Sequence, residues 1–417
     1  MSAAHKAELH PDEKITIHKW SGKVTAIGGA IGAIFLGITA FLGQSESTFE
    51  QVNDMHLVSR AHYSYLVAYT YFLSISLGAL FFVILQHLVK AKWSIVVRRL
   101  AEILTGTFPV MLILALPIII PLLLGNDGAY GAWVTPTAEN EHLIHQKSAW
   151  LNPGFFAGRI IFYCLVWIAL SRHFFKKSVE QDESGDPEIN TKLRVLSAPM
   201  IIVYAITLCA AAFDLLMSVS PAWFSTIFGV YYFAGCALSI FAVLSLVGLL
   251  LQKKGRLVHS ITVEHYHDLG KLMFAFVFFW SYIAFSQFML IWYANIPEET
   301  FWFNYRMFTS WSGVSVLLLF GHCVFPFLCL LSRWTKRILP LLVFFCCWLM
   351  VMHYVDLFWV VMPEFTPDGF SFHIVDITAL IGVGGIFVAA AAFSARGVNL
   401  IPTKEPGLAD SLAFENY

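Results

Sequence analysis

Ionisable and imidazole side chains lie inside long apolar runs of this sequence, where a charge is costly. Counting about 1.5 Å of rise per residue from the ends of the runs divides them into two sets by depth. The outer set comprises His62, Arg159, Asp214, His353, Asp356 and Asp376, and the inner set comprises His87, Glu102, Asp268, Lys271 and His322. Histidine exchanges protons near neutral pH, and burial can tune a carboxyl group toward that range. Two sets that enter from opposite faces therefore indicate two half-channels for protons.

The spacing of these residues also allows structural roles. His353 and Asp356 are three residues apart and share a helix face, and His373 and Asp376 repeat that spacing. Arg159 and Asp214 lie at similar depth on different runs, so they can form a buried ion pair. An ion pair with helix-capping histidines is the structural alternative to a proton path. A b-type haem between His322 and His353 is a further alternative.

The runs that carry these residues have the length of membrane spans. The chain has 417 residues, of which 58% are hydrophobic and only 13% charged, against about a quarter charged in soluble proteins. A bilayer core needs about 20 apolar residues per helix. Ten runs qualify, at roughly 20–43, 63–89, 100–124, 153–171, 196–220, 227–252, 271–295, 308–332, 338–362 and 374–395. We therefore predict an all-α integral membrane protein with ten transmembrane helices.

Basic residues predict the orientation of these ten spans. The N-terminus and every second connection hold 22 of the 26 Lys and Arg residues. Because basic residues accumulate on the cytoplasmic side of a membrane, both chain ends are expected there. The predicted organisation is a cytoplasmic segment at 1–19, a membrane domain at 20–395 and a cytoplasmic tail at 396–417. The net charge of −1 gives no basic surface for nucleic acid.

The connections and glycines carry further expectations. Residues 125–152 are too apolar for a solvated tether and are expected to dock against something, whereas the charged stretch 172–195 is expected to be a solvated linker. The tail from about 396 is expected to run along a surface. Pro109, Pro117 and Pro121 should kink the third span. Gly28, Gly29, Gly32 and Gly37 allow close helix approach, either within the fold or to a partner subunit.

Cofactor motifs are missing from the sequence. Its seven cysteines all fall inside apolar runs, and none forms a C-x-x-C pair or a C-x-x-C-H motif. Disulfides, zinc, iron–sulfur clusters and c-type haem are therefore not expected in this chain. A large extramembrane stretch is also missing, so a soluble catalytic domain would have to come from another chain.

Two long stretches resemble a known family. Residues 267–300, HDLGKLMFAFVFFWSYIAFSQFMLIWYANIPEET, and residues 213–235, FDLLMSVSPAWFSTIFGVYYFAG, are similar to the NrfD-like membrane subunits of the polysulfide-reductase family. Within that family, the closest resemblance is to the second NrfD-like subunit of bacterial alternative complex III, a quinol:cytochrome c or oxidase oxidoreductase of the respiratory chain. The resemblance covers nearly the whole chain.

The resemblance implies an architecture and a set of partners. The family fold has two four-helix bundles, at spans 2–5 and 6–9, with flanking first and last spans. The partners it implies are a sister NrfD-like quinol-binding subunit, peripheral iron–sulfur and cytochrome c subunits, and a terminal oxidase, in the bacterial inner membrane. Iron–sulfur clusters and c-type haems would belong to those partners. Relatives are expected to carry an acidic residue and a His near the turn 218–223, and this chain has neither there. If quinol chemistry depends on those groups, this chain does not bind quinol directly.

Three functions follow as hypotheses. The leading one is a cofactor-free membrane subunit of a quinol-oxidising electron-transfer complex, which is not catalytic alone and contributes a proton path or conformational coupling. The second is a structural scaffold that anchors the peripheral iron–sulfur and haem c subunits. The third is a stand-alone ion-coupled transporter, for which the sequence offers only the kinked third span.

Overall fold

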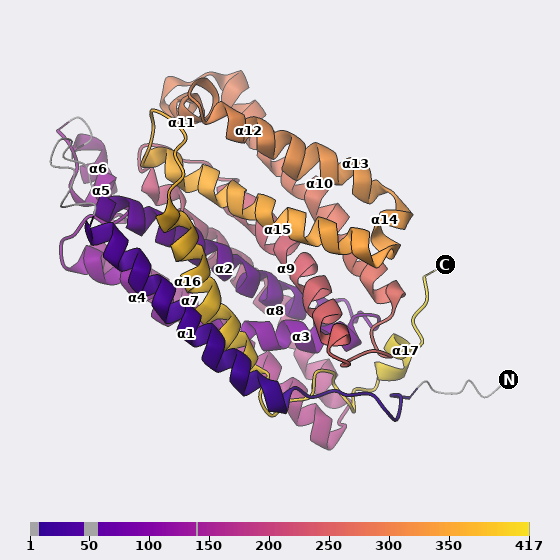
Figure 1. Ribbon diagram of the computed structural model, residues 1–417. Coiled ribbons are helices and arrows are strands. Elements are labelled where there is room, and N and C mark those ends of the chain that lie inside the picture. Colours follow the sequence, from indigo (N-terminus) through magenta and orange to yellow (C-terminus); the bar gives the residue numbers. More distant parts are fainter. Residues whose placement is uncertain (1–7, 46–56, 139–140, 417) are drawn as a thin grey trace.

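The fold is built from helices that cross the molecule end to end. The structure, a computed structural model, describes residues 8–45, 57–138 and 141–416, and every regular element in those ranges is a helix (Figure 1). Ten segments are long and apolar enough to span a membrane. They are α1 (His18–Ser45), α2 (Leu57–Leu88), α3 with α4 (Ile95–Thr105, Phe108–Leu123), α7 (Pro153–Ser184), α8 (Glu188–Leu215), α9 (Phe228–Lys253), α10 (Val263–Ala294), α12 with η3 and α13 (Ser312–Leu318, Leu319–Val324, Phe325–Leu331), α15 (Leu339–Val361) and α16 (Ile374–Ser394). The prediction of an all-α integral membrane protein with ten spans is confirmed.

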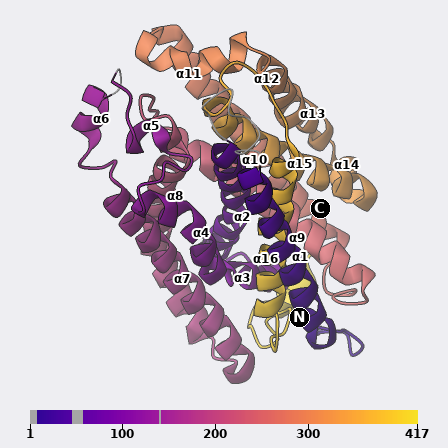
Figure 2. The ribbon, with the colours of Figure 1, turned by 60° about the vertical axis from the view of Figure 1, so that its left-hand side comes forward.

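The ten spans pack as two groups of four with one pair at the side. Helices α2, α3–α4, α7 and α8 contact one another, and so do α9, α10, α12–α13 and α15. The two groups meet mainly where α2 crosses α9, and α1 packs along α16 beside α2 (Figures 1 and 2). This packing matches the two-bundle arrangement that the resemblance implies.

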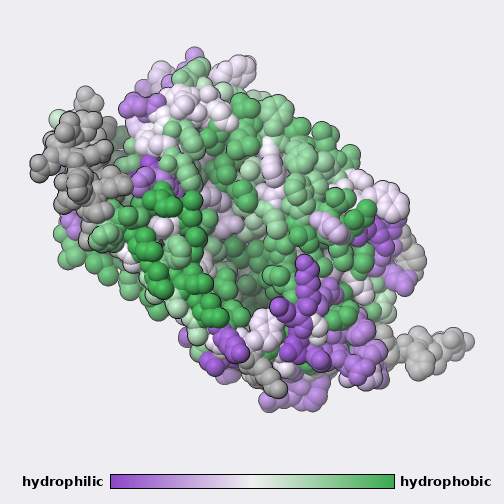
Figure 3. All heavy atoms as spheres, in the orientation of Figure 1, coloured by the Kyte–Doolittle hydropathy of each residue, from purple (hydrophilic) through white to green (hydrophobic). Residues whose placement is uncertain are grey.

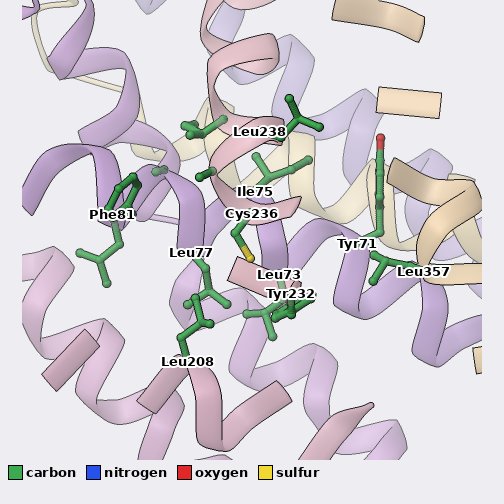
Figure 4. Close-up of a cluster of buried hydrophobic side chains, with 14 of the residues drawn as sticks. Tyr71, Leu73, Ile75, Leu77, Phe81, Leu208, Tyr232, Cys236, Leu238 and Leu357 are labelled. Carbon is green, nitrogen blue, oxygen red and sulfur yellow. The ribbon is translucent and has the colours of Figure 1, made fainter. Parts of the chain in front are cut away.

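The crossing of α2 and α9 forms the centre of the apolar core. Leu73 and Ile75 of α2 lie beside Tyr232 and Leu238 of α9, and Leu77 lies beside Leu208 of α8, all nearly or fully buried (Figure 4). The helices approach so closely that a Cβ atom at Gly78 would overlap the carbonyl of Cys236. Small residues allow this contact, which helices in lipid need because apolar burial alone does not drive them together.

The surface divides into an apolar belt and two polar ends (Figure 3). We call one end the basic end, because it carries the described parts of both chain termini and the basic connections 89–94, 185–187, 254–262 and 332–338. We call the other the α11 end, after α11 (Pro297–Phe308), which lies there with α5 (Gly131–Val134), α6 (Glu141–Lys147) and η4 (Met362–Glu364). Large exposed apolar side chains such as Ile34, Phe285 and Leu328 cover the belt between them.

The prediction that residues 172–195 form a solvated linker is wrong. Helix α7 continues to Ser184 and α8 begins at Glu188, so three residues connect them, with Gly185 in the left-handed conformation at the C-cap. Leu193 and Phe174 on these extensions are buried. The charges misled the prediction because they occupy the exposed face of helices that protrude past the apolar belt.

Two spans are interrupted, each near a proline. The third breaks between Thr105 and Phe108, immediately before Pro109. The eighth contains the π-helical turn η3, directly before Pro326, and Trp348 donates to the Gly321 carbonyl of that turn at 2.7 Å. Proline lacks an N–H group, so carbonyls of the preceding turn lose their usual partner. Such interruptions are tolerated in membrane helices where neighbouring helices satisfy the freed groups.

The loop 125–152 and the C-terminal tail pack onto this chain. At the α11 end, the hydroxyl of Tyr130 donates to the Leu215 carbonyl at 3.0 Å, and Trp133 is buried. At the basic end, the tail runs along the helix ends, where Leu400 and Ile401 are buried and Leu400 donates its N–H to Ile15. The loop thus covers the ends of α7 and α8, while the tail links the N-terminal segment to the first bundle.

The glycines of α1 serve contacts inside the fold. A Cβ atom at Gly32 would lie 2.7 Å from Ile386, and one at Gly28 would lie 3.0 Å from the carbonyl of Gly385, both on α16. A Cβ atom at Gly37 would meet nothing within 4 Å. The intramolecular explanation therefore accounts for Gly28 and Gly32 and leaves Gly37 free for other contacts.

Candidate functional site

Asp214 lies near the α11 end of the first bundle in a fully paired setting. Arg159 of α7 donates to both of its carboxylate oxygens at 2.8 Å, so the ion pair expected from sequence is present. Tyr163 Oη and Trp150 Nε1 donate to the same carboxylate at 2.9 and 3.1 Å. The Arg159 guanidinium also lies over the rings of Trp150 and Phe155. Both charges are buried and mutually compensated, which is the signature of a structural ion pair.

Asp356 lies near the α11 end of the second bundle and lacks a cation. Its carboxylate accepts hydrogen bonds from the hydroxyl of Tyr231 on α9 and from Trp280 Nε1 on α10, the latter at 3.1 Å. The side chain is 2% exposed, and no ion pair within the described part of the chain includes it. A negative charge at this place has only two neutral donors, so it costs several kcal/mol that a bound proton removes.

The two aspartates occupy equivalent places in an internal repeat. The sequence from Asp214 reads D-L-x-x-x-V-x-P as far as Pro221, and the sequence from Asp356 repeats this pattern as far as Pro363. Each carboxylate accepts from one Tyr hydroxyl and one Trp Nε1. The difference between the sites is Arg159, which has no counterpart among the contacts of Asp356. The donors come from different elements, since Tyr163 lies on α7 and Trp150 in the loop before it, whereas Tyr231 lies on α9 and Trp280 on α10. The fold thus contains two carboxyl sites with the same types of donor, one with a cation and one without.

Two histidines lie close to the uncompensated site. His353, one turn from Asp356 on α15, shares a 2.8 Å hydrogen bond between its Nε2 and Ser74 Oγ of α2, and its Nδ1 has no partner in the part of the chain that the structure describes. Its ring fits against Gly235 of α9, where a Cβ atom would overlap it. His322, on the π-helical turn, lies against Trp280 in a tilted arrangement with ring centroids 3.9 Å apart, and neither of its nitrogens has a partner among the described residues.

We call Asp356, His353, His322, Tyr231 and Trp280 the Asp356 cluster. It joins α9, α10, η3 and α15, and Ser74 connects it to the first bundle. Because His353 uses Nε2 for Ser74 and Trp280 covers His322, the arrangement gives a haem between the two histidines no support. The cluster offers instead a buried carboxyl group and two imidazoles with unused nitrogens, which are groups that take up and release protons.

Asp376, the last acidic member of the outer set, belongs to a separate ion pair. Arg60 donates to its Oδ2 at 2.7 Å and Ser64 donates to its Oδ1 at 2.5 Å. Asp376 also accepts from the backbone N–H of His373, whose own side chain caps α16. His62, also on α2, lies beside Gly128 of the loop. These residues fix the start of α16 against α2.

The inner set does not form one cluster. Glu102 is fully buried and pairs with Arg98 and Arg99 on its own helix, at 3.3 and 3.0 Å. Arg98 also binds Glu405 of the tail, and Arg99 binds Asp182 of α7 at 2.8 Å. This network of two guanidinium groups and three carboxyl groups ties α3 to α7 and to the tail at the basic end.

The remaining inner residues lie around this network or far from it. His87 is 5% exposed, its Nε2 has no partner within the described ranges, and it lines a cavity of about 300 Å³ with Arg98 and Glu405. Asp268 and Lys271 form a partly exposed pair on α10, in the second bundle. His322 belongs to the Asp356 cluster. Of the two sets expected from sequence, the structure brings His353, Asp356 and His322 together near the α11 end and leaves the other inner residues in separate groups at the basic end.

Two cations at the α11 end cap the repeated motif. Lys147 Nζ donates to the Pro221 carbonyl at 2.6 Å, and burial lowers the pKa of Lys147. Arg306 of α11 donates to the carbonyls of Trp359 and Val360 at 3.1 and 2.7 Å, and burial lowers its pKa to about 10. Cations at helix C-termini are favourable because the free carbonyls carry partial negative charge. From sequence, Lys147 and Arg306 entered only the count of basic residues that predicts the orientation of the spans.

Other functional residues were missed by sequence reasoning for different causes. The sequence gives no sign that Tyr231, Trp280 and Ser74 face the Asp356 cluster, because the rotation of each helix about its axis is not known from sequence. The pairing of Arg98 and Arg99 with Glu102 has a visible signal, because residues three and four apart share a helix face. Within the residues that the structure describes, no group of three His, Cys, Asp or Glu side chains is placed to hold a metal ion.

Fold and site together define the class of this protein as a ten-span helical membrane protein with a buried carboxyl group and two buried imidazoles clustered in its second bundle. No protein-family profile matches the chain, and no curated protein matches it.

Proposed function

We propose that this chain is a membrane subunit of a bacterial quinol-oxidising respiratory complex, in which the Asp356 cluster carries protons. The observation that supports the proton role most strongly is the buried carboxyl group of Asp356, held between Tyr231 and Trp280 with no cation. Ionisable residues at membrane depth usually serve ion or proton pathways. The equivalent residue Asp214 is neutralised by Arg159, so the second bundle is the proton-active one.

The complex supplies what this chain does not carry. The long similarity to NrfD-like subunits supports membership in an alternative complex III, with a sister quinol-binding subunit, iron–sulfur and haem c subunits, and a terminal oxidase as partners. The excess of Lys and Arg at the basic end supports an orientation with that end in the cytoplasm. In this orientation the Asp356 cluster lies in the outer half of the membrane, where a proton can leave after crossing.

The test uses the assembled complex, purified through an affinity tag on this chain from its native bacterial membrane. Co-purification of subunits that bind iron–sulfur clusters and haem c supports the respiratory assignment, and isolation of this chain alone contradicts it. The complex is then reconstituted into liposomes with the variant Asp356→Asn. The control is Asp368→Asn, because Asp368 is an exposed aspartate at the same end of the molecule.

The proton role predicts that Asp356→Asn lowers proton release per quinol oxidised, while Asp368→Asn leaves it unchanged. Asn does not titrate. Its Oδ1 can accept from Trp280 Nε1 while its Nδ2 donates to the Tyr231 hydroxyl oxygen, so the fold should survive the change. Equal proton release from wild type and Asp356→Asn, at equal rates of quinol oxidation, would refute the proton role and leave membership in the complex standing. Proton or ion flux through the purified chain alone would favour the transporter hypothesis.

A scaffold role is the second candidate, favoured by the shape of the α11 end. Helix α6 projects there (Figure 1), and its residues Glu141, His142 and His145 are exposed. The apolar side of the same loop is already used within this chain, so these polar residues are the part left for a partner. Replacing the three by Ala should release peripheral subunits without unfolding the chain. Retention of all subunits after this change would contradict docking at α6.

A further inference from the structure

A cavity of about 690 Å³ lies beside the interruption of the third span, in the half of the molecule nearer the basic end. Residues of α7 form one wall, and residues of α16 and α1 form another. Helices α3 and α4, which contact both α7 and α16, complete the lining (Figure 2). At the interruption, a Cβ atom at Gly106 would overlap the hydroxyl group of Ser394. We call this space the α7–α16 cavity, and its size is within the range of ligand sites.

The α7–α16 cavity is polar at one end and apolar along the rest of its length. Arg172 of α7 and Arg396, which follows α16, lie at the polar end. The apolar lining consists of Pro109, Val110, Phe175, Ile386, Ala389, Ala390 and Phe393. Ile386 lies eight residues, about 12 Å of helix rise, before the end of α16 at Ser394. The apolar part therefore extends from the basic end into the apolar belt.

The polar end carries positive charge without a counter-charge. Among the described residues, no Asp or Glu lines the α7–α16 cavity, and no ion pair includes Arg172 or Arg396. The smaller cavity at the same end differs, because Glu405 and Asp410 of the tail line it together with its cations. Two guanidinium groups that face one space from different helices are suited to bind a phosphate group between them.

The level of the two arginines discriminates between kinds of ligand. Arg172 directly follows the apolar stretch of α7, and Arg396 lies two residues beyond α16, so both lie where the apolar belt ends. A phospholipid has its phosphate at this level and its acyl chains below, in the same order as the charges and apolar walls of the cavity. A free phosphate ion would leave the apolar walls uncovered. A zwitterionic lipid carries a cation of its own, so two arginines favour an anionic head group.

From these observations we propose that the α7–α16 cavity binds an anionic phospholipid, with its phosphate between Arg172 and Arg396 and an acyl chain along α4 and α16. The bound lipid joins α7 of the first bundle to the α1–α16 pair at its side. The surface of the cytoplasmic leaflet is negatively charged by such lipids, which agrees with the orientation proposed for the basic end. Lipid binding goes beyond the proposed function, because it requires neither quinol oxidation nor a proton path.

The site is tested by photolabelling of the full chain, purified in mild detergent with whatever subunits remain bound. The probe is phosphatidylglycerol with a diazirine on one acyl chain, and the competitors are phosphatidylglycerol, phosphatidylcholine with the same chains, and glycerol 3-phosphate. Arg172→Gln and Arg396→Gln each remove a charge, and Val110→Trp fills the apolar part. The matched controls are Arg333→Gln and Ile113→Trp, because Arg333 is exposed at the basic end, Ile113 is exposed on α4, and neither lines the cavity.

The expected result is labelling of α4 and α16 peptides that phosphatidylglycerol suppresses at about tenfold lower concentration than phosphatidylcholine, while glycerol 3-phosphate has no effect. Each Arg→Gln change in the cavity should weaken competition by phosphatidylglycerol about fivefold, the contribution of one cation near an anionic head group, and Arg333→Gln should not. Val110→Trp should abolish the labelling, and Ile113→Trp should retain it.

Three outcomes would overturn the lipid site. Equal competition by the two lipids would show that the arginines do not select an anionic head group. Suppression by glycerol 3-phosphate would identify a site for free phosphate compounds. Labelling confined to other segments or to a co-purified subunit would show that the lipid does not occupy this cavity. Each outcome leaves the proton release of the complex to be judged separately.

Discussion

The internal repeat allows a direct test of what a cation does to a buried carboxyl group. Asp214 and Asp356 share a Tyr donor and a Trp donor, and only Asp214 has an arginine. We predict that Asp214→Asn destabilises the fold far more than Asp356→Asn. The first change leaves the guanidinium of Arg159, which is 7% exposed, without its counter-charge. The second replaces one acceptor with another and leaves no charge behind.

The magnitudes follow from the two environments. Removing one partner of a buried ion pair costs about 3–5 kcal/mol, which corresponds to about a 10²- to 10⁴-fold change in the unfolding equilibrium. In Asp356→Asn the amide oxygen can accept from Trp280 and the amide N–H can donate to the Tyr231 hydroxyl oxygen, so its cost should be about 1 kcal/mol. Adding Arg159→Met to Asp214→Asn should restore part of the loss, because Met keeps contact with the Trp150 and Phe155 rings that flank Arg159.

The assay is reversible unfolding of the purified protein in mixed micelles of a mild detergent and dodecyl sulfate, followed by tryptophan fluorescence. All four proteins, the wild type, the two single variants and the double variant, are compared at one lipid-to-protein ratio. If Asp214→Asn and Asp356→Asn change the free energy of unfolding equally, the reasoning about charge compensation is refuted. A double variant no more stable than Asp214→Asn would show that the unpaired guanidinium is not the source of the loss.

Three further predictions concern packing and charge elsewhere. Gly235→Ala should break the His353–Ser74 hydrogen bond, because the new methyl group overlaps the imidazole ring. The expected loss in the free energy of unfolding is about 1–3 kcal/mol. Thermal unfolding tests it against Gly37→Ala, whose added methyl group meets nothing within 4 Å. Arg306→Met should lower the free energy of unfolding by about 3 kcal/mol, because the Trp359 and Val360 carbonyls and Glu364 lose their donor. The same unfolding assay uses Lys254→Met, an exposed position, as control. Equal stability of both variants and wild type would contradict this prediction. Glu405→Gln should loosen the tail from Arg98. Limited proteolysis should therefore cleave the tail several-fold faster in this variant than in the control Glu415→Gln, whose side chain is exposed. Equal cleavage rates would show that this ion pair does not hold the tail.

The fold and one part of the site were predictable because their signals are local. Ten apolar runs give ten spans, since the length of a membrane helix is set by the thickness of the bilayer. Arg159 and Asp214 could be paired from sequence because two opposite charges at equal depth in an apolar medium have few other partners. The ends of α7 and α8 were misjudged, because charged residues on the exposed face of a helix resemble those of a linker.

Tertiary structure alone decided which polar residues act together. Depth along each helix can be counted from sequence, but the rotation and neighbours of each helix depend on packing such as the α2–α9 contact at Gly78. Only that packing places Tyr231 and Trp280 around Asp356, assigns Asp376 to Arg60, and brings Glu405 from the tail to Arg98. The sequence by itself determined the number, length and polar content of the spans. Their assembly decided that one aspartate has a cation while its repeat-related partner has none, because that depends on which side chains face each other across helices far apart in the chain.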